Sequence, residues 1–442
     1  MERNILLEAL LDEAGMSHSG LAARVNLLRA AGGKVTRYDH TSVGRWINGQ
    51  RPRGRVPDLI CEVLGKQLER PISLSDIGMG MQSVEQIIPL TEFVVQAAIL
   101  WRRDQQRARA SDTSVVTGMR AIAPIWEWEN PPEDGDVSRW QGHQIQTCDI
   151  AILQAARTRY EVMYRQVGGV ATWARVVGFL NEHATPLLRG SYSDQTGRSL
   201  FRATGGLAAV AGICAYDSDA QGLAQSYFHQ ALRMAKASGD RGFGGYVIAL
   251  LVNQALFLKC YRQAIAFAEA GLRTAGPHIS PALRTDLFVM QAKAYAGMKA
   301  TSEAHRCIML AEQAASNIRR ENEPPETGYM EPGLVQAQLA EAFISLGELA
   351  PAREYAVEAV RTHAHARGRI HRMATLTTVD LNRGEVEQAA TTAMHMVDLA
   401  VGMESHRLRD RFEKLRNRLV RTGSASATEA AARIDHVLSI PL

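Results

Sequence analysis

The residues of this sequence with the clearest chemistry are basic and polar side chains near its start, spaced so that they could contact DNA. A guanidinium fork such as that of Arg45 can read base edges in a major groove, and small polar groups beside it can do the same. Alternate arginines follow from position 51 to 55, where they could hold phosphates on either side of the groove. The predicted DNA-binding residues are His40, Thr41, Ser42, Arg45, Asn48, Arg51, Arg53, Arg55, Lys34 and Arg37.

A short helix would have to present these side chains, and residues 40–48 have the pattern of one. Asp39 is a suitable N-cap because its carboxylate can accept hydrogen bonds from the free amides of the first turn, and Gly49 suits the left-handed position after a helix. Apolar residues at i, i+3 and i+4 form a ridge on one side: Val43, Trp46 and Ile47. An ordinary amphipathic helix followed by a solvated basic loop would have the same pattern.

The positive charge of the chain is concentrated around this helix. Between Arg24 and Arg55 there are eight Lys or Arg residues against one acid, Asp39, which gives +7. Since the whole chain carries +4, the remainder sums to −3. Such a local excess is the electrostatic footprint expected of a nucleic-acid-binding domain.

A second helix pattern lies in front of the first. Leu21, Ala22 and Val25 have the spacing of a packed helix within the phrase Ser-Gly-Leu-Ala-Ala-Arg-Val. Together with Arg-Trp-Ile-Asn-Gly at 45–49, this segment resembles the helix-turn-helix of XRE-type bacterial regulators.

The resemblance implies that the helix over 40–48 enters the major groove. By position, the residues facing bases would be His40, Thr41 and Arg45, and those near the DNA backbone would be Ser42 and Asn48. The connector departs from the family, because about ten residues with two adjacent glycines replace the usual turn of three or four. The angle between the two helices therefore stays open.

The chain of 442 residues fits two or three domains. Its hydrophobic share of 46% and its low aromatic share of 6%, with many alanines, indicate helices packed at small contacts. The predicted fold class is all-α, with an N-terminal helix-turn-helix domain followed by a solenoid of tetratricopeptide-like helical repeats. The predicted divisions are an XRE-like domain over 1–80, a partly helical linker over 81–137, a helical lead-in over 138–204, repeats over 205–420 and a tail with a short helix over 421–442.

Five segments from residue 224 onward place small or apolar residues at the same offsets. They start at Ala224, Ala264, Ala304, Ala352 and Ala389, which are 40, 40, 48 and 37 residues apart. Each segment follows another helix, so the unit is a helix pair slightly longer than the 34 residues of a tetratricopeptide repeat. Such pairs stack into a superhelix with a concave groove. Generic all-helical packing is the alternative.

Aligning these repeats puts four polar residues at equivalent positions that face the groove: Asn253, Lys293, Glu341 and Thr378. Asn or Lys side chains along one wall can satisfy the backbone of an extended peptide, so these residues are candidate ligand contacts. The alternative is that they are ordinary polar residues on a solvated face.

Other chemistry has little support in the sequence. His363, His365 and His371 do not form a convincing metal site, because residues two apart on a helix point to different sides and no Cys, Asp or Glu completes a set. The sequence has no nucleophile elbow and no zinc motif, so neither an enzyme nor a cofactor is expected.

The cellular setting follows from the cysteines and the hydropathy. Five scattered cysteines without a C-x-x-C pair indicate reduced core thiols of a cytosolic protein. No run of about 18 apolar residues occurs, so no membrane partner is expected.

From end to end, the chain resembles a family of actinobacterial regulators that join an XRE-type domain to tetratricopeptide repeats. The phrases that carry this likeness are Arg-Tyr-Asp-His-Thr-Ser-Val-Gly-Arg-Trp from Arg37, Gln-Arg-Pro-Arg-Gly from Gln50, Thr-Pro-Leu-Leu-Arg-Gly-Ser-Tyr from Thr185, and Gly-Leu-Ala-Gln-Ser-Tyr-Phe-His-Gln-Ala-Leu-Arg from Gly222. Members of the family include negative regulators of morphological differentiation and antibiotic production in streptomycetes.

The resemblance and the basic helix together predict a cytoplasmic, nucleoid-associated transcription regulator that binds double-stranded DNA sequence-specifically, as a repressor of development or secondary metabolism. One such domain makes few base contacts, so a symmetric homodimer is expected. The repeats would serve dimerisation and the sensing of a peptide, small-molecule or protein effector. Two alternatives stay open: an effector-responsive receptor with the architecture of the peptide-pheromone receptors of Firmicutes, and a repeat scaffold that does not bind DNA.

Overall fold

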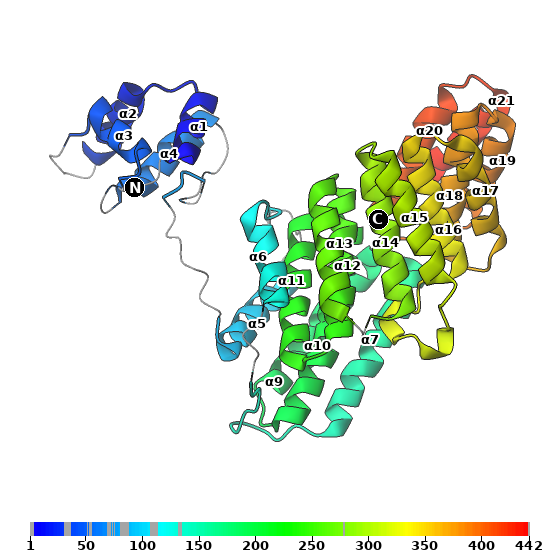
Figure 1. The fold of residues 1–442 in the computed structure, drawn as a ribbon, viewed down its shortest axis with the longest axis horizontal. Helices are drawn as coiled ribbons and strands as arrows, with labels where there is room; N and C mark the ends of the chain where they lie inside the picture. Colours follow the sequence, from blue (N-terminus) through cyan, green and yellow to red (C-terminus); the bar gives the residue numbers. More distant parts are fainter. Residues whose placement is uncertain are drawn as a thin grey trace. The chain divides into compact units, whose positions relative to one another are not determined.

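The structure is a computed structural model, and it confirms the all-α class. It describes residues 4–30, 37–50, 52, 55–68, 72, 74, 76–79, 88–106, 114–130, 135–276 and 279–440. Within these ranges the only β-pairing is two isolated bridges, Arg139 with Tyr192 and Gln144 with Ser191. The chain divides into two compact units, Met1–Ile88 and Pro89–Leu442, which are described separately (Figure 1).

The N-terminal unit packs its helices around one apolar core. Its helices are α1 (Ile5–Glu13), α2 (His18–Ala30), α3 (His40–Ile47) and α4 (Val56–Leu68). Leu21, Val43 and Leu64, from three different helices, have no exposed surface. Asn4 ties distant segments to this core, because its amide N–H donates to the Ile47 carbonyl at 2.6 Å and its side chain to the Ile77 carbonyl at 2.9 Å.

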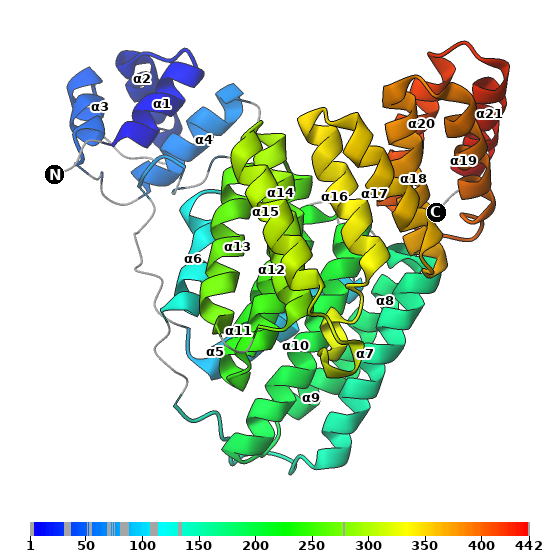
Figure 2. The same ribbon diagram turned by 45° about the vertical axis from the view of Figure 1, so that its right-hand side comes forward.

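The second unit is built mainly from helix pairs, each pair joined by a short turn (Figure 2). The pairs are α10 (Asp194–Asp217) with α11 (Gln221–Ser238), α12 (Arg241–Phe257) with α13 (Tyr261–Ala275), α14 (Pro281–Gly297) with α15 (Thr301–Ala315), α16 (Pro332–Leu346) with α17 (Leu349–Arg361), α18 (Ala366–Arg383) with α19 (Val386–Asp398), and α20 (His406–Val420) with α21 (Ala425–Ser439). Short 3₁₀ turns at Arg320–Asn322 and Pro325–Thr327 lie between α15 and α16. The first helices of successive pairs contact one another and form an inner layer.

The turns of these pairs repeat with the spacing that the sequence predicted. A left-handed residue stands at the same place in five of them: Asp219, Lys259, Lys299, Gly347 and Gly384. In each turn the next residue donates its N–H to a carbonyl five residues earlier, as Ala220 does to Ala215. The five alanines that start the predicted segments have no exposed surface. The helix-pair repeat is therefore confirmed, while its assignment to the tetratricopeptide class stays a prediction.

The segment predicted as a linker over 81–137 behaves differently in the structure. Its described helices, α5 (Leu90–Gln106) and α6 (Met119–Glu129), belong to the second unit. Trp101 is fully buried and donates from Nε1 to Gln230 at 2.9 Å. Trp128 is also buried and donates to Thr274 at 2.9 Å, as expected of a docked indole, whereas Trp126 is exposed. The difference arises because α5 and α6 carry apolar faces that pack on the rest of the second unit.

The second unit also has a lead-in before the pairs. Its elements are α7 (Thr147–Val167), α8 (Gly169–Phe179), a π-helical turn at Leu180–Ala184 and α9 (Thr185–Leu188). The corner between α7 and α8 meets the loop before α20, where the Glu404 N–H donates to the Val167 carbonyl at 2.7 Å. Gly168 at this corner has φ +97°, and a Cβ there would lie 2.1 Å from the Glu404 carbonyl oxygen. The lead-in therefore packs against both α10 and the C-terminal part of the repeats.

The hydropathy of the helices and the environment of the cysteines can be compared with the predictions. Among the described residues, α10 alone is long and apolar enough to span a membrane, and 83% of its apolar window is buried among other helices. The described cysteines are all free thiols. Cys61, Cys214 and Cys307 are buried as predicted, but Cys148 is exposed, so the prediction of a core thiol was wrong there.

Candidate DNA-reading helix and a cavity in the repeat unit

The start of α3 is fixed by its first residues, as predicted. Asp39 accepts from the Ser42 amide at 2.9 Å, and its own N–H donates to the Ser42 hydroxyl at 3.4 Å, which forms a capping box. Hydrogen bonds from the Thr41 and Ser42 hydroxyls and the Ser42 amide hold the pKa of Asp39 well below its ordinary value. The chain leaves the helix through Gly49 with φ +93°.

One face of α3 is anchored and the other is turned to solvent. Val43, Trp46 and Ile47 are buried, which confirms the predicted ridge. The Tyr38 ring packs edge-on against Trp46 at a centroid distance of 5.1 Å. The Asn26 side chain fixes the approach to α3, because it bonds both the N–H and the carbonyl of Tyr38, at 2.8 and 2.7 Å. Four of the predicted DNA-binding residues of this segment are exposed: His40, Thr41, Arg45 and Asn48.

Ser42 does not fit the prediction of a DNA contact. It is only 7% exposed, and its hydroxyl donates to Asp39 at 2.8 Å and accepts from Arg45 Nη2 at 3.3 Å. Its hydroxyl therefore caps the helix. The spacing Asp39-x-x-Ser42 is that of a capping box and could have revealed this in the sequence.

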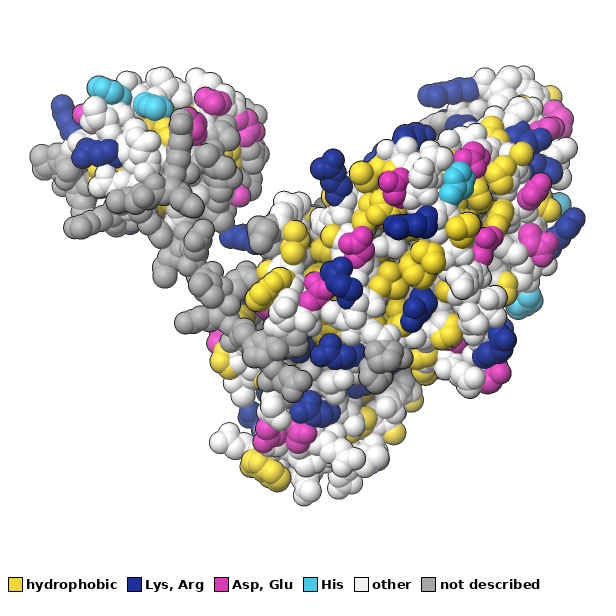
Figure 3. Space-filling model, viewed as in Figure 1, with side chains coloured by type: hydrophobic (Ala, Val, Ile, Leu, Met, Phe, Trp, Pro, Cys, Tyr) yellow, Lys and Arg dark blue, Asp and Glu magenta, His cyan; other side chains and the backbone are white. Residues whose placement is uncertain are grey.

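The remaining predicted DNA-binding residues are only partly described. Arg37 and Arg55 are exposed, one before α3 and one after it. Lys34, Arg51 and Arg53 lie outside the described residues. On the face of this unit drawn in Figure 3, basic side chains gather toward α2 and α3, and acidic ones toward α1. On this face, the described basic side chains therefore lie on the side of α3.

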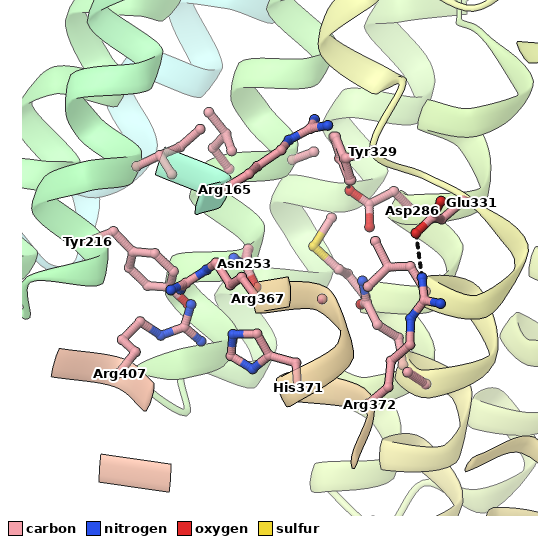
Figure 4. Close-up of a pocket in the computed structure, with 18 of the residues that line it drawn as sticks. Arg165, Tyr216, Asn253, Asp286, Tyr329, Glu331, Arg367, His371, Arg372 and Arg407 are labelled. Carbon is pink, nitrogen blue, oxygen red and sulfur yellow. Dashed lines mark hydrogen bonds and ion pairs between the residues drawn. The ribbon is translucent and has the colours of Figure 1, made fainter. Parts of the chain in front are cut away.

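A second candidate site is a cavity of about 310 Å³ inside the repeat unit, within the range of small-molecule sites. It is lined from α7, α10, α12, α14, α16, α18 and α20, so it occupies the concave side of the inner layer. Figure 4 shows Tyr216, Asn253, Arg367, His371 and Arg407 at one end, and Asp286, Tyr329, Glu331 and Arg372 toward the other.

Three of the four predicted ligand contacts line this cavity: Asn253, Lys293 and Glu341. Thr378 does not line it, and its hydroxyl donates to the Ala374 carbonyl at 2.8 Å. Thr375, one turn earlier, lines the cavity and accepts from Arg411 of α20 at 2.6 Å. The N-terminal half of α18 therefore lines the cavity instead.

Lys293 and Glu341 are paired with each other and are not independent polar groups. The Lys293 ammonium lies 2.8 Å from Glu341, and the Arg411 guanidinium lies 2.9 Å from the same carboxylate. Burial in the cavity wall raises the pKa of Glu341, but the charges and hydrogen bonds of Lys293 and Arg411 outweigh it, so the pKa falls well below its ordinary value. Glu341 therefore stays ionised and forms ion pairs with both Lys293 and Arg411.

Several residues of the cavity were not expected from the sequence. Arg367 is 4% exposed and bonds Asp217, a residue with no exposed surface, across 150 positions of sequence. Ser405 donates to the same carboxylate at 2.8 Å, and the Gly169 amide does so at 2.8 Å. Burial, and then the charges of neighbouring arginines, lower the pKa of His371 well below its ordinary value, so its ring is neutral. Long-range contacts of this kind leave no local pattern.

Comparison with known proteins adds one finding. Residues 7–80 match the model of a family described as the SP15 N-terminal domain. No curated protein matches the chain. The match spans the described helices α1 to α4, including α3, and does not extend into the repeat unit.

Proposed function

We propose that this protein is a cytoplasmic transcription regulator that binds DNA sequence-specifically through α3, and that it acts as a repressor of the actinobacterial XRE-type class with tetratricopeptide repeats. The observation that carries the proposal is the two-sided character of α3. Its apolar ridge is buried, while His40, Thr41 and Arg45 face solvent. An exposed polar helix face of this kind suits insertion into a major groove.

The residues divide into two roles in this proposal. Arg45 can donate two hydrogen bonds to a guanine edge, because its one hydrogen bond to a described residue is a long one to Ser42, at 3.3 Å. Arg37 and Arg55 are exposed on either side of α3 in the sequence and would contact phosphates. Base contacts from one short helix are few, so a symmetric dimer on two half-sites would supply the specificity.

Selection from a pool of random duplexes tests this proposal. The full-length protein should enrich a motif with two-fold symmetry, and its affinity should fall steeply as salt rises because phosphate contacts release counterions. Failure to enrich any motif, together with weak and sequence-independent binding, would favour a repeat scaffold that does not bind DNA.

A further inference from the structure

We infer that the cavity of the repeat unit binds a small organic anion whose charged group sits between Tyr216, Arg367 and Arg407. This inference goes beyond the proposed function, because it depends only on the second unit of the chain. It assigns a ligand chemistry to the cavity and a role to residues that the sequence did not single out.

Hydrogen-bond donors without partners gather at one end of the cavity. The Tyr216 hydroxyl, Arg367 Nη1 and Arg407 Nε are buried, and no described residue accepts from them. Tyr216 and Arg367 are each 4% exposed. Buried polar groups in folded proteins almost always have a partner. Since the three groups come from α10, α18 and α20 and lie together in Figure 4, an acceptor bound between them would satisfy all three.

The charges around the cavity also leave one cation uncompensated. The other described cations of the lining have acidic partners: Arg165 with Glu161, Arg372 with Glu331, Arg367 with Asp217, and Lys293 and Arg411 with Glu341. Arg407 instead has no acidic partner among the described residues, and its guanidinium carbon lies 4.1 Å from the Tyr216 ring centre and 5.0 Å from that of Phe257. A partly buried cation without a counter-ion favours an anionic ligand.

His371 contributes a further donor at the same end. Arg411 Nη1 lies 3.3 Å from His371 Nδ1, and a guanidinium can only donate, so Nδ1 is the acceptor. Because the ring is neutral, its proton then resides on Nε2, which can donate to a ligand. The neutral ring also leaves Arg407 and Arg367 as the charged groups that an anion would meet.

The apolar side chains of the cavity favour a ligand in which the anionic group is attached to an apolar group. Ile213, Leu250, Met290 and Leu334 belong to the lining. A volume of about 310 Å³ suits a small amphipathic acid. The same chemistry could come from a free organic acid or from the C-terminal carboxylate of a short hydrophobic peptide, so the shared feature is an oxyanion on an apolar group.

Two fluorescent probes that differ in one charged group test the inference. Anilinonaphthalene sulfonate carries an oxyanion on an aromatic body, and N-phenylnaphthylamine is its neutral counterpart. The full-length protein should bind the sulfonate more tightly. Arg407→Met and Tyr216→Phe should each weaken sulfonate binding by about tenfold, the worth of one charge-assisted hydrogen bond, and leave binding of the neutral probe within about twofold.

These variants avoid damage to the fold. Arg407 has no acidic partner in the part of the chain that the structure describes, so its replacement strands no buried carboxylate there, whereas loss of Arg367 would strand Asp217. Tyr216→Phe removes a buried hydroxyl without a partner, so the thermal unfolding midpoint should stay the same or rise. Arg416→Met is the matched control, because Arg416 lies on α20 but pairs with Asp435 at 3.0 Å and does not line the cavity.

Competition then identifies the source of the anion. Octanoate is compared with octanamide, and a trileucine peptide with its C-terminal amide. Displacement of the sulfonate by an acid but not by its amide supports the inference and shows which source binds. Equal binding of the two probes, equal displacement by acids and amides, or unchanged sulfonate affinity in both variants would overturn it. None of these results depends on DNA binding, so the proposed function can fail separately.

Discussion

Asp286 is a buried carboxyl group in the wall of the cavity. It is 5% exposed and accepts a hydrogen bond from the Tyr329 hydroxyl at 2.5 Å. Burial raises the pKa of Asp286 to about 6, although the Tyr329 hydrogen bond and the Lys293 charge oppose the rise. The folded protein therefore holds a proton on this carboxyl more tightly than the unfolded chain does.

Asp286→Asn should remove a pH dependence of stability. Because the folded pKa is above the unfolded value of 3.8, the favourable contribution is complete below the unfolded pKa and is lost as pH rises through about 6. The loss amounts to about 3 kcal/mol, from roughly two pKa units. Urea unfolding of both proteins should show the wild-type stability falling relative to the variant over this range, and a constant difference would refute the assignment.

At the scale of single residues, the sequence was informative where a role depends on near neighbours. Asp39 as a cap and Val43, Trp46 and Ile47 as a ridge depend on residues within two turns, and the structure bears them out. Tyr216 and Arg407 could not be predicted in the same way. They meet only because α10 and α20 converge on one cavity, 191 positions apart in the chain.

At the scale of elements, Asp217 joins segments that are far apart in sequence. It bonds the start of α8, Arg367 of α18 and Ser405 at the start of α20. The Asp217 carboxylate has no exposed surface and Arg367 has almost none, so water stabilises neither charge. Each side chain therefore depends on the other to balance its charge.

Asp217→Ala should therefore destabilise the repeat unit strongly. Removing one partner leaves the Arg367 charge buried and unpaired, which costs about 3–5 kcal/mol. Denaturant unfolding followed by circular dichroism measures this directly. Glu429→Ala is the matched control, because Glu429 forms an exposed pair with Arg433 and its loss should cost about 0.5 kcal/mol or less. A comparable loss in both variants would contradict the role given to Asp217.

The repeat period was predictable at this scale because each turn imposes the same local requirement. Small buried residues recur with the pair and leave a trace in the sequence, whereas the left-handed position is filled by Asp, Lys or Gly and leaves little. The packing of α5 and α6 left a weaker trace. Phe93, Ala97 and Trp101 form a stripe at helical spacing, which agrees with a partly helical segment but does not show what the helix packs against, so the segment was interpreted as a linker.

At the scale of the whole molecule, the chain separates a unit that contains a locally basic segment from a larger unit that contains a cavity. The net charge of +7 between Arg24 and Arg55 falls in the first unit, and the anion site proposed above falls in the second. A ligand in the cavity could change DNA binding only if it favoured one arrangement of the two α3 helices over another. The choice of operator depends on how two α3 helices are placed in space, and the choice of ligand depends on how distant helices line the cavity. The sequence alone therefore did not predict either.

The central claim is that α3 reads bases through Arg45, and its most direct test compares two charge-matched variants on the selected DNA motif. Lys66→Ala removes one exposed cation from α4 of the same unit, where Lys66 pairs with Glu62 at 2.8 Å. Arg45→Ala should cost about 1–3 kcal/mol at particular base pairs and relax the preference there, while Lys66→Ala should leave the preference unchanged. If Arg45→Ala retains the wild-type preference at every base pair, the assignment of α3 as the DNA-reading helix is contradicted.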